Sequence, residues 1–355
     1  RFEGLSFAHS DWSIARDKPA DGQAATFAGA AVSASGARRC AFERCEIAHV
    51  GQHGLWLGRG CQENRVEQCE IHDLGAGGIY IGEPARATVP AAACARNRVH
   101  NCFIHDGGHV FAAGIGVWIG QSSYNTVSHN EICDFYYSGM SLGWTWGYGA
   151  SDAHDNVVEF NHIHHIGQGV LSDMGAVYTL GISPGTVIRN NLIHDILSYS
   201  YGGWGLYTDE GSTGILMENN VVYLTKSGGF HQHYGRENVL RNNILADASE
   251  GEVIRSRQEE HVSFFFEGNI VYQSQGPLLG GNWSNGNFRM DRNVYWHTSG
   301  ECELAGLPPE EWQEETRQDG QSVFADPIFV DAAGRNYTLK PESPALKLGF
   351  KQIDV

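Results

Sequence analysis

Two carboxylates, two imidazoles and two guanidiniums are concentrated in three strand-like segments, Leu206–Glu210, Phe230–Tyr234 and Ile254–Arg257. Each segment follows the previous one after one repeat of the chain. Aligned on their first apolar residue, they place one column of side chains at Tyr207, His231 and Arg255 and a second at Asp209, His233 and Arg257. Because the side chains of a strand alternate between its faces, both columns should point out of the core. We interpret this cluster as an active site on the outside of a stack of strands.

The acidic residues of the cluster suit acid–base chemistry, because bunched carboxylates acquire the raised pKa that a general acid needs. Asp209 and Glu210 are adjacent, so both can face one groove only if the strand ends there, and Gly211 follows at once. One of the two could be the reactive group and the other an anchor in the turn. Asp173 stands one repeat earlier, and the segment Gly167–Met174 would have to curl back to bring it near Asp209.

The histidines and arginines of the cluster allow several roles. His231 and His233 share a face and could chelate a metal ion, but three close ligands with an open position are not evident. We therefore expect no metal ion or other cofactor, and we assign both histidines to hydrogen bonding with substrate or to tuning the pKa of the acids. Arg255 and Arg257 could orient a carboxylate or hydroxyls of a substrate, or neutralise the acids.

Aromatic side chains lead up to the cluster in the first outward column, at Trp56, Tyr80, Trp118, Tyr178 and Tyr207. Such a stripe suits sugar rings, whose CH faces stack on aromatic planes. The alternative is packing under loops, which we favour for Trp56 and Trp118, whereas we expect Tyr178 and Tyr207 to bind substrate. Two aromatic loops, Trp144–Asp155 and Ser198–Trp204, should form the other walls and bring Trp146 and Trp204 to the substrate.

A repeat must position these residues. An Asn or a substitute is followed five positions later by Asn or Cys, and then by an aliphatic residue, as in NRVEQCEI (Asn64–Ile71) and NVVEFNHI (Asn156–Ile163). The spacing of about 23 to 33 residues is typical of repeat architectures. The second slot holds, in order, Cys45, Cys69, Cys102, Asn130, Asn161, Asn191, Asn220, Asn243, Asn269 and Asn293.

Each unit adds a second strand bracketed by glycines, as in GIYIG (Gly78–Gly82), and no crossover helix. This pattern predicts an all-β parallel β-helix of about ten or more coils, with Asn amides stacked inside a turn. We expect one domain over residues 1–355, with coils to about residue 300 and a C-terminal cap over about 301–355. The slot cysteines should be buried thiols, and Cys61 and Cys94 could either pair or remain free.

Charge and hydropathy exclude several classes of partner. The net charge of −17 argues against a nucleic-acid partner, which needs a basic face. No run of about 18 apolar residues exists, so we expect no membrane span. The chain begins at Arg1 inside a strand-like stretch, and we expect it to be a processed or trimmed piece of a longer product. The oligomeric state is not predicted.

The segments YTDEGS, FHQHYGRENVLRNNILA and DMGAVYTLG, preceded by GTVIRNNLIHD, resemble bacterial right-handed parallel β-helix carbohydrate-active proteins. The nearest named group is glycoside hydrolase family 141, which includes α-L-fucosidases and xylanases. The resemblance spans roughly Cys40 to Val355, although members of that family are usually longer. It implies chemistry by two acids on neighbouring coils, which by motif match are Asp173 in DMGAVY and Asp209 in YTDEG.

These observations predict a glycoside hydrolase acting on a plant or algal polysaccharide or oligosaccharide, with Asp173, Asp209 and Glu210 as the catalytic candidates. The resemblance implies an α-L-fucosidase or a xylanase. One alternative is a polysaccharide lyase acting on a uronate-containing glycan, in which the histidines and arginines serve as base and charge neutraliser. Another is a non-catalytic glycan-binding solenoid. A carbohydrate partner leads us to expect a secreted or periplasmic bacterial protein.

Overall fold

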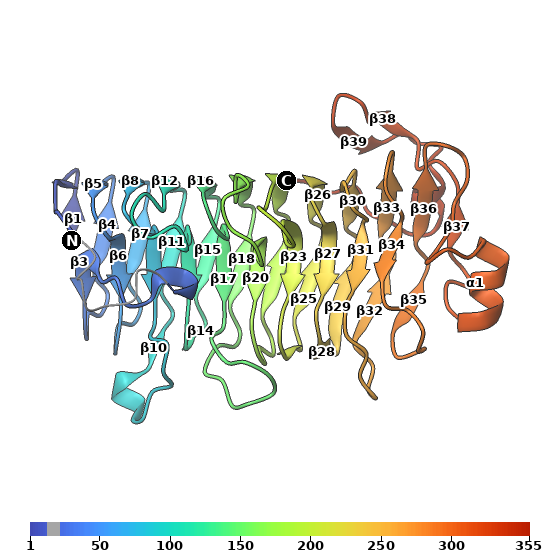
Figure 1. The fold of residues 1–355 in the computed structure, drawn as a ribbon. Coiled ribbons are helices and arrows are strands. Elements are labelled where there is room, and N and C mark those ends of the chain that lie inside the picture. Colours follow the sequence, from blue (N-terminus) through green and yellow to red (C-terminus); the bar gives the residue numbers. More distant parts are fainter. Residues whose placement is uncertain (13–21) are drawn as a thin grey trace.

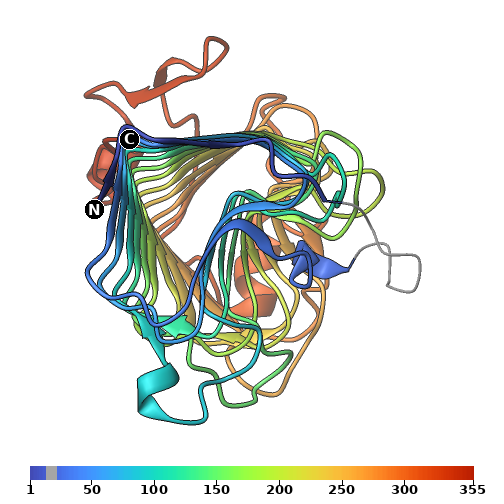
Figure 2. The same ribbon diagram turned by 90° about the vertical axis from the view of Figure 1, so that its left-hand side faces the viewer.

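The computed structural model describes residues 1–12 and 22–355. In these residues the chain winds through three long parallel sheets, named A, B and C, and successive coils contribute one strand to each sheet (Figures 1 and 2). The fold is a right-handed parallel β-helix, as the repeat and the resemblance predicted. No helix in the described part of the chain is long and apolar enough to cross a membrane.

Sheet A consists of β1 (Phe2–Glu3), β4 (Ala41–Glu43), β7 (Arg65–Glu67), β11 (Arg98–His100), β15 (Thr126–Ser128), β18 (Val157–Glu159), β21 (Val187–Arg189), β25 (Leu216–Glu218), β29 (Asn238–Arg241), β32 (Phe264–Glu267) and β35 (Arg289–Asp291). Sheet B consists of β2 (Ser6–Ala8), β5 (Glu46–Val50), β8 (Glu70–Leu74), β12 (Phe103–Gly107), β16 (Glu131–Phe135), β19 (His162–Ile166), β22 (Leu192–Ile196), β26 (Val221–Thr225), β30 (Ile244–Ala246), β33 (Ile270–Gln273), β36 (Val294–His297) and β37 (Val323–Phe324).

Sheet C consists of β3 (Ala30–Ala34), β6 (His53–Leu57), β9 (Ile79–Ile81), β13 (Val117–Ile119), β17 (Met140–Leu142), β20 (Gly175–Thr179), β23 (Trp204–Thr208), β27 (Gly228–Gln232), β31 (Val253–Arg255) and β34 (Leu279–Gly281). Two short pairs lie in the turns that leave sheet C: β10 (Cys94–Ala95) with β14 (Ser122–Ser123), and β24 (Ser212–Thr213) with β28 (Gly235–Arg236). The short 3₁₀ helices are η1 (Gln23–Ala25) and η2 (Pro90–Ala92).

Asparagine amides form a ladder inside the corner between sheets A and B. The Nδ2 of Asn161 donates to the Oδ1 of Asn191 at 3.0 Å, and Asn191 donates to Asn220 in the same way at 2.9 Å. Asn64, Asn97, Asn125 and Asn156 form a second ladder at the entry to sheet A. These side chains are buried, so the bonds between coils satisfy amides that burial would otherwise penalise. The structural role predicted for the repeated Asn is confirmed.

The slot cysteines are interior thiols, as predicted. Cys45, Cys69 and Cys102 lie buried in the ladder slot of the first coils. All eight cysteines of the chain are described and free. The alternative of a disulfide between Cys61 and Cys94 is therefore not realised. The Sγ of Cys61 instead contacts the carbonyl of Ala34 at 3.3 Å.

The C-terminal segment closes the last coil and then folds back along the solenoid. In helix α1 (Pro309–Thr316), the Trp312 ring stacks on Phe288 with centroids 5.9 Å apart. Asp319 accepts a hydrogen bond from the ladder amide of Asn293 at 3.1 Å, which ends the ladder. The antiparallel pair β38 (Phe329–Asp331) and β39 (Asn336–Leu339), with α2 (Pro344–Lys347), covers apolar residues on the outside of sheet B, including Val221, Ile244, Ile270 and Val294.

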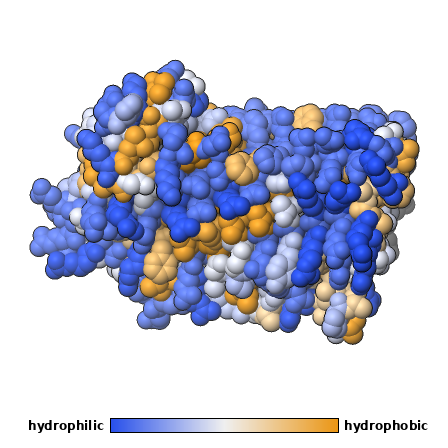
Figure 3. Space-filling view, turned by 180° about the vertical axis from the view of Figure 1, so that it is seen from behind, coloured by the Kyte–Doolittle hydropathy of each residue, from blue (hydrophilic) through white to orange (hydrophobic). Residues whose placement is uncertain are grey.

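The surface seen from behind carries a band of apolar residues across an otherwise hydrophilic face (Figure 3). On the outside of sheet A, successive strands align the partly exposed side chains of Val157, Val187, Leu216, Val239 and Phe265. Ion pairs flank this row, such as Arg189 with Glu159 and Arg241 with Glu218. The clustered acids and histidines of the sequence lie on a different sheet, C.

Candidate active site

The first outward column of sheet C has the predicted register from β6 to β27, and the register differs from the prediction at β31. Tyr178 in β20 pairs with Tyr207 in β23, which pairs with His231 in β27. Further along the same column, Trp118 pairs with Tyr80 and Tyr80 with Trp56. Tyr80 and Trp118 are fully buried, and Trp56 is half-buried. The alternative of packing rather than sugar stacking is therefore the correct one for Trp118, and the column becomes open to chemistry only near Tyr178.

Asp209 lies at the centre of the cluster. It follows β23 directly, and the residue is only 6% exposed. Its carboxylate accepts a hydrogen bond from the Tyr178 hydroxyl at 2.6 Å and contacts Nδ1 of His233 at 2.7 Å. Tyr207 adds a further hydrogen bond. The strand end thus allows Asp209 to face outward with groups from three successive coils around it.

Asp173 joins the cluster because the chain before β20 curls back. Its backbone is left-handed, with φ of 56°, and its amide donates to the carbonyl of Tyr201 at 2.9 Å. The Tyr137 hydroxyl donates to the Asp173 carbonyl at 2.9 Å, which fixes the loop from the other side. The Tyr207 hydroxyl then donates to Oδ1 of Asp173 at 2.9 Å. A single phenol therefore contacts both carboxylates, Asp173 and Asp209.

The two carboxylates differ in acidity. Burial, followed by repulsion from Asp209, raises the pKa of Asp173 above its usual value. Burial also pushes the pKa of Asp209 up, but hydrogen bonds from His233, Tyr178 and Tyr207 outweigh it and leave this pKa below the usual value. The bond to Asp209 in turn raises the pKa of His233, although burial opposes it. The pKa values of the two acids are therefore shifted in opposite directions, which favours Asp173 as the proton donor and Asp209 as the carboxylate in acid–base catalysis.

Glu210 does not enter this bonded group. Its carboxylate accepts a hydrogen bond from the Tyr234 hydroxyl at 2.8 Å, and its carbonyl accepts from the amides of Gly147 and Gly181. The residue thus secures the turn after β23 and joins it to the loop Trp144–Asp155. Of the two alternatives left open by the sequence, these contacts favour Asp209 as the reactive group and Glu210 as the anchor.

The two histidines have different environments although they share a face. The ring of His231 packs against Trp204 and Tyr207, with centroid distances of 4.1 and 4.9 Å, and its Nε2 lies 2.5 Å from the Ser256 hydroxyl. Burial lowers the pKa of His231 to about 3, so this imidazole is neutral. His233 is half-exposed and bonded to Asp209. The two rings are 6.4 Å apart, and neither belongs to a set of three metal-ligating side chains in the described part of the chain.

The register predicted for the arginines is wrong by one residue. His231 pairs with Ile254, and Arg255 pairs with Gln232. Arg255 is consequently buried inside the coil, where its guanidinium donates to the Asn282 carbonyl and to Oδ1 of Asn285. Val253, which we had not counted as the first apolar residue of the strand, fills the inward position. Arg257 remains exposed, with its guanidinium 4.4 Å from the centre of the Tyr234 ring.

Both aromatic loops contact residues of the site, the first through the Gly147 amide to the Glu210 carbonyl and the second through the Tyr201 carbonyl to the Asp173 amide. Trp146 is 51% exposed on the first loop and packs edge-on against Trp144. On the second loop, Trp204 is buried, whereas Tyr199 and Tyr201 are 77% and 58% exposed. Tyr178 and Tyr207 are almost fully buried, so their rings are not open to a sugar. Their hydroxyls instead donate hydrogen bonds to the carboxylates.

Several residues of the site were missed from the sequence. Tyr201 hydrogen-bonds the Asp173 carboxylate, and its place in the aromatic run SYSYGGW was the available signal. Gln23 donates to the Tyr178 hydroxyl at 3.2 Å from a segment 155 residues away. Tyr137 and Ser256 carry no local pattern that distinguishes them from other polar residues of the repeats.

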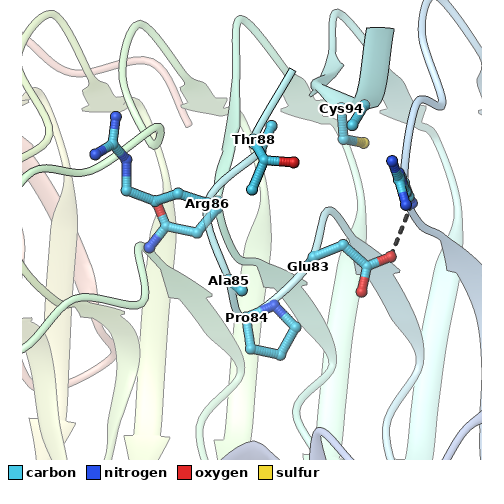
Figure 4. A pocket seen from close by; sticks show the side chains of 10 residues that line it. Glu83, Pro84, Ala85, Arg86, Thr88 and Cys94 are labelled. Carbon is cyan, nitrogen blue, oxygen red and sulfur yellow. Dashed lines mark hydrogen bonds between the residues drawn. The ribbon is translucent and has the colours of Figure 1, made fainter. Parts of the chain in front are cut away.

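A separate hollow of about 490 Å³ lies toward the N-terminal coils (Figure 4). Its walls include Glu83, Arg86, Thr88 and Cys94, and Glu83 accepts a hydrogen bond from the Arg59 amide at 2.8 Å. It is connected to the first aromatic loop, because Arg86 contacts Asp152 at 2.8 Å. Neither Asp173 nor Asp209 lines it.

Comparisons with known proteins agree with this architecture. Residues 28–196 match the family model described as a right handed beta helix region. A solved structure titled glycoside hydrolase is 30% identical with a TM-score of 0.56, over 60% of this chain and 38% of that one. A pectate lyase structure, 10% identical with a TM-score of 0.52, covers 79% of this chain and 73% of its own, and shows the fold alone.

Among curated proteins, an uncharacterized protein of Bacillus subtilis (strain 168) is 23% identical over 141 residues. These residues are 38% of this chain and 26% of that protein. The chain thus spans about a quarter of this relative and well under half of the glycoside hydrolase structure. The predicted resemblance to carbohydrate-active parallel β-helix proteins is confirmed, and these neighbours include both hydrolases and lyases.

Proposed function

We propose that this protein is a glycoside hydrolase in which Asp173 and Asp209 act as the catalytic pair on a polysaccharide or oligosaccharide. The observation that carries the proposal is that one phenol, Tyr207, contacts two carboxylates whose pKa values are shifted in opposite directions. Hydrolysis of a glycosidic bond needs one protonated carboxylic acid and one carboxylate on either side of the anomeric carbon. The similarity to the glycoside hydrolase structure supports the same class.

In this reaction Asp173 is the general acid. Its raised pKa makes Asp173 the better proton donor of the two acids, and protonation of the glycosidic oxygen by Asp173 lets the leaving sugar depart as an alcohol. Asp209, ionised and partnered by His233, attacks the anomeric carbon or takes a proton from the attacking water. Tyr178 and Tyr207 hold the Asp209 carboxylate in place through their hydroxyls.

The surroundings suit a carbohydrate. Exposed Trp146, Tyr199 and Tyr201 on the two aromatic loops offer flat apolar faces on which sugar rings can stack, and Tyr201 bonds to Asp173. The hollow beside Glu83 and Arg86 offers room for further sugar units of a longer chain. An α-L-fucosidase or xylanase activity remains our proposal for the specific reaction, on a plant or algal glycan outside the bacterial cell.

A polysaccharide lyase is supported less well. That reaction needs a cation or a metal ion to neutralise a uronate carboxylate beside the base. Arg255 is enclosed in the coil and committed to Asn282 and Asn285, and Arg257 lies over Tyr234. His231 is neutral but fully packed between aromatic rings. The preferred proposal therefore remains hydrolysis.

The test is a panel of defined glycans incubated with the protein, with products identified by mass spectrometry. We expect Asp173→Asn and Asp209→Asn each to reduce cleavage at least about 100-fold, because each removes a proton-transfer or nucleophilic group. Glu159→Gln, on the outside of sheet A, is the matched acid control and should retain full activity. Full activity in both site variants would refute the assignment.

A further inference from the structure

A second group of chemistry-bearing side chains lies on the outside of sheet B, around strands β16, β19 and β22 (β16 is labelled in Figure 1). The register aligns Glu131 with His162 and His164 with His194 on neighbouring strands. The histidines that follow the repeat's aliphatic residue, such as His72, His105 and His164, lie within strands, so they can meet side chains of the adjacent coils.

The geometry of three of these residues matches a metal centre. One carboxylate oxygen of Glu131 and one ring nitrogen each of His162 and His164 lie within 4.8 Å of one another. We propose that Glu131, His162 and His164 bind a divalent transition-metal ion, represented by Zn²⁺. Two imidazoles and one carboxylate are a common three-residue zinc set, which leaves a further position for water. Imidazole donors favour zinc, copper and nickel over the oxygen-preferring calcium and magnesium.

A neighbouring pair orients one of these ligands. Nδ1 of His194 contacts Oδ2 of Asp195 at 2.6 Å, which places the ring proton on Nδ1 and the lone pair on Nε2. Nε2 of His194 lies 2.7 Å from Nε2 of His162, so His162 donates there and keeps its own lone pair on Nδ1. Carboxylate–histidine relays of this kind set the tautomer of metal-ligating histidines.

Ring stacking alone does not account for the group. Histidines two residues further along each strand form stacked columns between coils, as His72 does with His105 and His164 with His194. His162 lies outside that column, in the outward position aligned with Glu131 and Leu192. Its approach to a carboxylate and two imidazoles is therefore specific to this point of the sheet. The site is accessible, because Glu131 is exposed and both histidines are partly exposed.

The proposed ion would join neighbouring coils, because its ligands come from β16 and β19. Since the ligands are brought together only by the folded coils, bound metal would also stabilise the solenoid. A second cluster on sheet B, Asp73, Asp106 and His109, meets the same distance criterion but contains a single imidazole. It is the natural competitor, and the experiment must separate the two.

The experiment is isothermal titration calorimetry of the untagged, chelator-treated chain with ZnCl₂, paired with the visible spectrum of added Co²⁺. We expect one tight Zn²⁺ equivalent, and we expect His162→Ala/His164→Ala to weaken it at least about tenfold and to remove the Co²⁺ bands. The matched control His72→Ala/His105→Ala and the competitor variant His109→Ala should each bind Zn²⁺ with an affinity within about twofold of the wild type.

Circular dichroism without metal establishes that every variant is folded. Equal Zn²⁺ affinity in the wild type and in His162→Ala/His164→Ala would overturn the proposal, as would loss of the site only in His109→Ala. Glu131→Gln should weaken binding while preserving the shape of the side chain, because it removes the anionic donor. Unchanged affinity in that variant would exclude Glu131 as a ligand and contradict the three-residue site.

Discussion

At the scale of single residues, the cluster shows how different surroundings shift the pKa values of two aspartates in opposite directions. Asp209 is the more deeply buried of the pair in its strand-end position, yet donors from His233, Tyr178 and Tyr207 keep it acidic. Asp173 accepts fewer hydrogen bonds, and its proximity to the charge of Asp209 makes its ionisation less favourable. The proposed roles follow from this difference in hydrogen bonding rather than from the residue type.

The contact between His233 and Asp209 leads to a prediction about pH. Asp209 must be ionised and Asp173 protonated, so the acidic limb of kcat/KM reports Asp209 and the alkaline limb reports Asp173. His233→Gln removes a cationic partner, so the pKa of Asp209 should rise and the acidic limb should move to higher pH. The measurement is a pH profile of kcat/KM on a glycan that the wild type cleaves.

The matched control for this prediction is His49→Gln, which alters a histidine bonded to Asp73 on sheet B. Its profile should coincide with that of the wild type. An acidic limb that stays in place in His233→Gln would show that another group controls it.

At the scale of elements, the loop before β20 decides whether the two acids can cooperate. Gly202, with φ of 105°, packs against this loop so closely that a Cβ would lie 2.7 Å from the Asp173 amide nitrogen. Gly202→Ala should therefore displace Asp173 and lower kcat/KM by about 100-fold while the coils stay folded. Kinetics together with circular dichroism measure both effects.

Gly169 in the same loop provides the comparison. It also has a positive φ, of 74°, but a Cβ there would meet nothing within 4 Å. Gly169→Ala also places a side chain on a left-handed backbone, but without the clash, so most activity should survive. If both variants lose activity equally, backbone strain rather than the position of Asp173 explains the result.

The same elements show what sequence can and cannot predict here. The Asn slot and the outward column from Trp56 to His231 followed from side-chain periodicity, because stacked coils repeat the same environment. Arg255 was misplaced because VIR was aligned on Ile254 instead of Val253, and a slip of one residue exchanges the faces of a strand. The position of Asp173 depends on a loop and on Tyr137, which no periodic pattern specifies.

At the scale of the whole molecule, stability depends on contacts between adjacent coils and on a closed end. Coil-to-coil amide bonds run as far as Asn293, and Asp319 then terminates them. The exposed edge that remains is covered by α1, whose Trp312 is 1% exposed. A solenoid without such a cover would present its last core residues to water.

Loss of this cover should destabilise the protein strongly. Trp312→Ala removes the ring that stacks on Phe288 and should cost about 3–5 kcal/mol of unfolding free energy. The measurement is urea denaturation monitored by circular dichroism, in which the midpoint of Trp312→Ala should lie at a lower urea concentration than that of the wild type. Trp146→Ala, at an exposed tryptophan, should leave the midpoint nearly unchanged. Equal midpoints for both variants would show that α1 does not protect the coils.

The central claim, hydrolysis by Asp173 and Asp209, is tested most directly by cleaving a substrate in water labelled with heavy oxygen and determining the product masses. The account predicts that each new reducing end carries one heavy oxygen, and that Asp173→Asn and Asp209→Asn abolish this product. An unlabelled product with an unsaturated, ultraviolet-absorbing end would contradict it and identify a lyase instead.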